Sequence, residues 1–283
     1  MYNYLIPSIA SLPQGYDCTF TVADDAIAGR LADGAGKVLR RTEVFVEGEA
    51  IEAETAILSF EDGELAAGEN EPLHWRGAGR DDIAHPGYLE ISYEAADGEP
   101  CFATNRPITP YAIYTAPGRK AFFSDNSQKF SNPVVIAQIA RFGEYVDGYP
   151  VVNIDRERDY GESLVLINPY KKPVLARIQA HDGRDTGRVR VPAMAARRID
   201  LSTLLAPDET RWAGRIQMTA NNRLVVYNVK HSLADPTVIS DHEHMDPFRS
   251  DPTHLPASQR LRLAIGGWLQ QVRAVAGAKR LGR

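Results

Sequence analysis

Short segments in which apolar and polar residues alternate recur along most of this chain. In YLEISYE, from residue 88, apolar residues at every second position are separated by polar ones. In TEVFVEG, from residue 42, Val44 and Val46 share one side. Because side chains in a strand alternate between two faces, this spacing predicts half-buried β-strands. Similar short runs follow between residues 164 and 220, namely LVLIN, VLARIQAH, RVRVPA and RIQMTA.

Turn-forming dipeptides separate the predicted strands. Asp-Gly and Asn-Asn pairs accept the backbone angles of tight hairpins. Asn221-Asn222 lies between two predicted strands and predicts a hairpin there. Short strands bounded by turns predict an all-β protein built from sandwiches or barrels. The Asp-Gly pairs begin at Asp33, Asp62, Asp97, Asp147 and Asp182.

The length of 283 residues leaves room for two domains of about 100–150 residues each. A strand–turn–strand pattern from Gly87 to Ser124 has a counterpart from Gly214 to Ser240, and whether the two are a true repeat stays open. We predict two tandem antiparallel β-sandwich domains, at residues 1–130 and 131–256. An amphipathic helix at residues 257–283 is predicted to follow them.

The predicted C-terminal helix offers a surface for a partner. Ser258 can cap its start, and apolar residues recur after it at helical spacing. Gly266 and Gly267 weaken the helix by about 1 kcal/mol each, so we expect it to lean on a surface. Docking onto an acidic protein surface is favoured over peripheral contact with an anionic membrane. The predicted partner-binding residues are Leu261, Ile265, Trp268, Val272, Arg260, Arg262 and Arg273.

Charge is distributed unevenly along the chain. The net charge is −5, yet residues 252–283 contain six Lys or Arg residues and no acidic residue. The rest of the chain is therefore strongly acidic, which argues against binding nucleic acid. No run of about 18 apolar residues is present. Cys18 and Cys101 do not form a CxxC motif, which indicates free thiols and a cytoplasmic location.

A segment rich in histidine and aspartate, SDHEHMDPFRSDPTHLP, runs from residue 240 to residue 256. A strand over 241–246 would place His242, His244 and Asp246 on one face, and His254 follows. These four residues are the candidate ligands of a zinc or iron ion. The interpretation we favour is an irregular strap without a cofactor, because three prolines force extended backbone and turns.

The sequence gives little indication of catalysis or of carbohydrate binding. The sequence contains no nucleophile elbow and no phosphate-binding loop, so an enzyme is not favoured. Aromatic residues in the first half are able to stack on sugar rings, although packing within sheets is the favoured role. These aromatic residues are Tyr88, Tyr93, Tyr111, Tyr114, Phe122 and Phe123.

Four short motifs between residues 160 and 240 carry a family resemblance. They are Ile167-Asn168-Pro169, Val191-Pro192-Ala193, Arg197-Arg198 and a later strand ending in His231. With these motifs the segment resembles the sensory-rhodopsin transducer family of soluble β-sandwich proteins. The resemblance implies a non-catalytic sandwich that assembles into oligomers and contacts partners. It implies no photoreceptor role, because the acidic first half and the histidine-rich segment lie outside it.

These observations predict a cytoplasmic, non-enzymatic binding or assembly module that acts through protein partners or self-association. Two alternatives stay open. One is a metal-dependent enzyme with a His/Asp site at residues 242–254, which zinc or iron would serve. The other is a carbohydrate-binding module that uses the aromatic residues of the first half.

Overall fold

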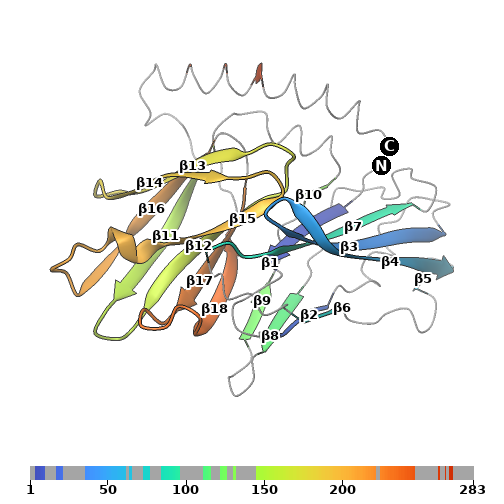
Figure 1. The fold of residues 1–283 in the computed structure, drawn as a ribbon, viewed down its shortest axis with the longest axis horizontal. Helices are drawn as coiled ribbons and strands as arrows, with labels where there is room; N and C mark the ends of the chain where they lie inside the picture. The colour runs from blue at the N-terminus through green and yellow to red at the C-terminus, as the bar shows by residue number, and fades with distance from the viewer. Residues whose placement is uncertain are drawn as a thin grey trace.

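The described part of the chain is mostly β-strand, arranged in antiparallel sheets (Figure 1). This confirms the predicted all-β class. The structure, a computed structural model, describes residues 4–9, 17–21, 36–61, 64–65, 73–76, 84–95, 111–115, 122–125, 130–131, 145–220, 224–245, 261, 265 and 268–269.

The first half contributes two sheets. A six-stranded sheet has the order β10-β1-β7-β3-β4-β5, and a four-stranded sheet has the order β6-β2-β8-β9. The bounds are β1 Tyr4–Ile9, β2 Asp17–Thr21, β3 Lys37–Val46, β4 Glu49–Glu61, β5 Glu64–Leu65, β6 Leu73–Arg76, β7 Tyr88–Ala95, β8 Tyr111–Thr115, β9 Phe122–Asp125 and β10 Phe130–Ser131.

The second half contributes two four-stranded sheets, β11-β16-β13-β14 and β15-β12-β17-β18. The bounds are β11 Tyr145–Asp155, β12 Gly161–Asn168, β13 Val174–Ala180, β14 Asp185–Val191, β15 Ala195–Asp200, β16 Arg211–Ala220, β17 Val225–His231 and β18 Ile239–Met245. A 3-10 helix, η2 Leu201–Leu204, follows β15 and is capped by the side chain of Asp200.

A shared hydrophobic core joins the two sheets of the second half. Leu164, Leu166 and Val226 enter it from one sheet, and Ile178 and Ile216 enter it from the other. Every second residue of β13 is buried, as the alternation in its sequence predicts. β12 is buried along its whole length, so both of its faces are covered.

The predicted hairpin at Asn221-Asn222 is wrong. β16 pairs with β11 and β13, whereas β17 pairs with β12 and β18, so the chain crosses between sheets there. β7 and β8 of the first half also belong to different sheets. Alternation predicts a strand but says nothing of the sheet that it joins. Residues 221–223 themselves lie outside the described residues.

Two of the Asp-Gly pairs have different outcomes. Asp182-Gly183 forms the turn between the paired strands β13 and β14, where Gly183 has a φ of +96°. Asp147-Gly148 lies within β11, next to a shift in the register with β16, so the predicted turn there is wrong. β11 accommodates Asp147-Gly148 because the strand is irregular at the register shift and does not need regular backbone angles there.

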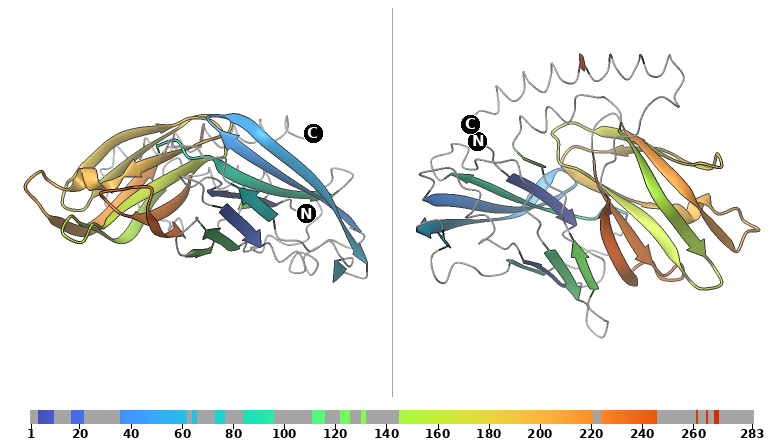
Figure 2. Two further views of the ribbon diagram at one scale, coloured as in Figure 1. Left: turned by 60° about the horizontal axis from the view of Figure 1, so that its bottom comes forward. Right: turned by 180° about the vertical axis from the view of Figure 1, so that it is seen from behind.

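Polar contacts join the two halves of the chain, whose sheets lie side by side in Figure 2. The backbone N–H of Gly48, in the β3–β4 turn, donates to the carbonyl oxygen of Met194 at 3.0 Å. Arg197 forms an ion pair with Glu47 in the same turn. The hydroxyl of Tyr88 contacts the sulfur of Met194 at 3.8 Å. Met194 makes two of these contacts and has a left-handed φ of 50°, which is uncommon outside glycine.

Four residues after position 256 are described. Leu261, Ile265, Trp268 and Leu269 each have helical backbone geometry, and the rest of the predicted helix lies outside the described residues. None of the helices in the described part of the chain has the length and apolar character that a membrane span requires.

Candidate functional site

The histidine-rich segment begins as a β-strand. β18 pairs with β17 in an antiparallel register that places His242 opposite Val229. The imidazole of His242 is buried and meets the ring of Tyr227 edge-on, with 5.4 Å between ring centroids and an interplanar angle of 86°. The first part of the segment is therefore ordered sheet rather than an irregular strap.

The other predicted metal ligands are not brought together in what the structure describes. The Cα atom of His244 pairs with that of Tyr227. The side chain of His244, together with Asp246 and His254, lies outside the described residues. Among the residues that are described, no three His, Cys, Asp or Glu side chains form a group able to hold a metal ion. A metal site at residues 242–254 stays a prediction.

A second histidine forms a buried pair with a serine. Nε2 of His231 lies 2.7 Å from Oγ of Ser163, and Nδ1 lies 2.8 Å from the carbonyl oxygen of Ser232. A carbonyl only accepts, so Nδ1 carries the proton and Nε2 accepts from the hydroxyl of Ser163. Burial lowers the pKa of His231, which favours this neutral ring.

The Ser163–His231 pair has the contact of a nucleophile with its base, but not the access that catalysis needs. Both residues are buried within the sheet, on the adjacent strands β12 and β17. A substrate carbonyl cannot approach a fully buried Oγ atom, so the pair is structural. Sequence reasoning missed it because the two residues are 68 positions apart.

A buried carboxylate ties three strands together at another point of the core. Oε1 of Glu162 accepts from the backbone N–H of Asn153 at 3.0 Å and from the hydroxyl of Tyr160 at 3.2 Å. Oε2 accepts from the side-chain amide of Asn228 at 2.6 Å. Burial, with the charge of Glu162, raises the pKa of Tyr160 to about 12, so its hydroxyl stays a donor.

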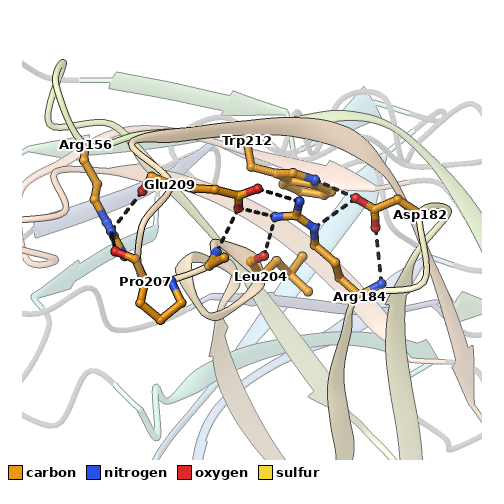
Figure 3. Close-up of polar contacts among 8 residues, drawn as sticks. Arg156, Asp182, Arg184, Leu204, Pro207, Glu209 and Trp212 are labelled. Atoms are coloured by element: carbon orange, nitrogen blue, oxygen red, sulfur yellow. Dashed lines mark hydrogen bonds and ion pairs between the residues drawn. The ribbon is translucent and has the colours of Figure 1, made fainter.

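A cluster of polar contacts centres on Arg184 (Figure 3). Its guanidinium binds Glu209 through two nitrogens, at 2.5 and 2.8 Å, and Asp182 at 3.0 Å. It also lies over the indole ring of Trp212, 5.6 Å from the centroid. The indole N–H donates to Asp182 at 2.9 Å. The cluster links the β13–β14 turn to the segment before β16, a structural role.

The hydrogen bonds from Arg184 to Glu209 change the acidity of that carboxyl. They lower the pKa of Glu209 to about 2, and the backbone N–H of Ala206 contributes to the same effect. Arg156 donates to the backbone oxygens of Pro207 and Glu209 beside them. A carboxylate held ionised in this way is suited to anchoring a loop and not to general acid catalysis.

The four described helical residues after position 256 are apolar and exposed. Leu261, Ile265, Trp268 and Leu269 expose between 41% and 62% of their surface. Three of them were predicted to bind a partner, and Leu269 adds to the set. The remaining predicted residues, Val272, Arg260, Arg262 and Arg273, lie outside the described residues.

The aromatic residues of the first half are described at one position. Tyr88 is fully buried and stacks on Phe45, with 5.3 Å between ring centroids. This confirms core packing for Tyr88 and excludes it as a platform for sugar rings. The side chains of Tyr93, Tyr111, Tyr114, Phe122 and Phe123 lie outside the described residues.

Comparison with protein-family models, with curated proteins and with solved structures finds no match. The resemblance of residues 160–240 to the sensory-rhodopsin transducer family therefore stays a prediction.

Proposed function

We propose that this protein is a non-catalytic binding or assembly module that acts through protein partners. In this proposal two tandem antiparallel β-sandwiches form a cytoplasmic body, and an amphipathic helix over residues 257–283 presents the partner-binding surface. Neither nucleic acid nor a catalytic metal is needed for this role.

One observation carries the proposal, namely the exposed apolar stripe formed by Leu261, Ile265, Trp268 and Leu269. The last three stand four, seven and eight residues after Leu261, so all four share one face of a helix. A helix face of this kind gains stability when it is buried, and exposed apolar groups of this size are typical of interaction sites. Trp268 is the residue type most enriched at binding hot spots.

The chemistry of the segment defines the class of partner. Residues 252–283 contain basic residues and no acidic ones, so the complementary surface is an apolar groove with an acidic rim. A helix that docks into a groove is read through anchors at these spacings. An anionic membrane offers related chemistry, and the experiment has to separate the two.

Site-specific photocrosslinking tests the proposal. A benzophenone amino acid replaces Ile265 in the full chain, and the same group replaces Val238 as a matched control, because Val238 is also exposed and apolar. After irradiation in cells, adducts are resolved by electrophoresis and identified by mass spectrometry. We expect a protein adduct from position 265 that is absent from position 238, and that is lost when Trp268→Ala is added.

Two results would contradict the proposal. Adducts with lipid alone would make the helix a membrane anchor. Equal protein adducts from both positions would show that the helix has no preferred partner.

A further inference from the structure

The outward face of the sheet β11-β16-β13-β14 carries an excess of arginine. The inward-facing residues of β13 and β16 pack in the core, so the residues between them point outward. Val151 and Leu175 on the outward face expose 53% and 50% of their surface. We call this surface the arginine face. Its exposed basic and apolar residues are Arg177, Arg188, Arg190, Arg211, Arg215, Val151 and Leu175.

Charge on the arginine face is poorly compensated within the chain. The register of β13 and β14 places Arg177 directly opposite Arg188, and like charges in such pairs repel. Asp185 binds Arg177. Among the described residues, Arg188 and Arg190 take part in no ion pair.

β16 extends the same surface. Arg215 stands opposite the exposed Val151, and Arg211 stands opposite Asp155. Neither arginine forms an ion pair with another described side chain. Arginine beside exposed aliphatic residues is the composition of a protein-binding surface, and its excess charge selects an acidic partner.

β4 provides an acidic surface with exposed apolar residues in the same chain. From Ala50 to Leu58 this strand pairs with β3 and, in the described part of the chain, with no strand on its other side. Ile51 and Ile57 expose 47% and 57% of their surface. Glu49 and Glu54 are exposed on the same strand, and the register with β3 places them on the opposite face of the strand from Ile57. An edge strand with these features is open to association. We call residues 49–58 the β4 surface.

The two surfaces are complementary, and β4 runs away from the second half of the chain after its Glu49 end, which follows the turn where Gly48 contacts Met194 (Figure 1). β16, which carries Arg211 and Arg215, lies at the opposite end of the molecule from the β5 end of β4 (Figures 1 and 2). We propose that the β4 surface of one copy docks on the arginine face of a second copy. β4 then docks by its open edge, so that glutamates on one side of the edge approach the uncompensated arginines. Ile57 on the other side, with Ile51 at the register shift, covers Leu175 and Val151.

This contact joins two different surfaces, so in a pair one copy keeps its arginine face available and the other keeps its β4 surface. A heterologous contact of this type forms a ring if its rotation closes and an open chain if it does not. Screening by salt weakens the contact, because its charges lie at the protein surface. The inference uses surfaces separate from residues 257–283 and therefore stands or falls independently of the helix proposal.

Sedimentation velocity of the full chain with charge-reversed variants tests the inference. One variant carries Arg188→Glu and Arg190→Glu, and the other carries Glu49→Arg and Glu54→Arg. We expect the unchanged protein to sediment as species larger than a monomer at low ionic strength and to shift toward the monomer as salt is added. Each variant alone is expected to sediment as a monomer, since both of its surfaces then carry the same sign of charge.

Sedimentation of a mixture of the two variants decides whether the two surfaces contact each other. In the mixture each reversed surface meets a surface of opposite charge, so we expect the larger species to return. Lys171→Glu with Lys172→Glu is the matched control, because both lysines are exposed and lie outside the arginine face. That control and Trp268→Ala are expected to sediment like the unchanged protein.

Three results would overturn the inference. They are a monomer at every ionic strength, variants that associate like the unchanged protein, and a mixture that stays monomeric. Loss of association in Trp268→Ala with no effect of the arginine substitutions would instead assign self-association to the helix.

Discussion

Arg184 donates hydrogen bonds to both carboxylate oxygens of Glu209, which lies 25 residues away in the chain. The two parallel hydrogen bonds fix the plane of the carboxylate as well as its position, which a lysine cannot do. Arg184 reaches Glu209 from the tip of the β13–β14 turn, so the pair closes one end of the second half. The same guanidinium lies over the ring of Trp212, a member of the core.

Replacing Glu209 by glutamine should make the free energy of unfolding change less as the pH falls from about 4.5 toward 2. The pKa of Glu209 is about 2, below its ordinary value of 4.5, so the unfolded chain binds its proton more readily. The stability that this carboxylate adds is fully present above about pH 4.5 and is lost as the pH falls toward 2. Urea unfolding of both proteins across this range should give stabilities that converge at low pH.

Arg177→Gln serves as the comparison for that experiment, since Arg177 holds Asp185, another carboxyl whose pKa is lowered. A difference between Glu209→Gln and the unchanged protein that persists at pH 2 would show that the carboxylate acts through shape and not through its charge.

Strand positions follow from local pattern, and sheet membership does not. The alternation in Val174–Ala180 exists because one face of that strand is buried, so its sequence reveals the strand. The run Leu164–Asn168 is continuous because β12 is covered on both faces. Asn221-Asn222 nevertheless suggested a hairpin where the chain crosses between sheets, because turn chemistry alone carries no information about the partner strand.

Contacts between side chains on different strands are likewise not predictable from local sequence pattern. Ser163 and His231 meet only through the register of β12 and β17, which no local pattern records. The arginine face had a readable signal, since Arg188 and Arg190 alternate with valines and so had to share one face of a strand. What remained hidden was that Arg177 would stand opposite Arg188, which depends on the register of β13 and β14.

Removing the hydroxyl of Ser163 should destabilise the fold without altering its surface. Ser163→Ala leaves Nε2 of the buried His231 without its donor, at a cost of about 1–3 kcal/mol. Ser240→Ala is the control, because its hydroxyl is exposed and bonds the oxygen of Lys230 at 3.2 Å. Urea denaturation measures both. Equal stabilities for the two variants would show that the buried hydrogen bond contributes little.

Glu90→Gln should stabilise the protein at alkaline pH and not at acid pH. Burial raises the pKa of Glu90 to about 8, and Glu43, which faces it across β3 and β7, adds to the rise. The folded state therefore keeps a proton that the unfolded chain releases above about pH 4.5, so stability falls as the pH rises toward 8. In thermal unfolding at several pH values, the midpoint of the variant should rise relative to that of the unchanged protein as the pH increases along this range.

The histidine-rich segment makes a prediction about metal. His242 packs on Tyr227, so His242→Ala should cost about 2–4 kcal/mol through lost packing, with or without chelator. We expect the thermal midpoint of the unchanged protein to be insensitive to chelator. A midpoint that drops on chelation, together with about one zinc or iron per chain lost in the double variant His242→Ala, His244→Ala, would establish a metal site instead.

Two tryptophans separate binding from folding. Trp212 lies in the core and donates to Asp182, so Trp212→Ala should cost about 3–5 kcal/mol. Trp268 is exposed, so Trp268→Ala should change the stability by no more than about 0.5 kcal/mol and still abolish the proposed helix contact. Urea unfolding gives the first quantity, and the photocrosslink from position 265 gives the second. A large loss of stability in Trp268→Ala would place that ring in a folded contact and contradict its role as a free binding surface.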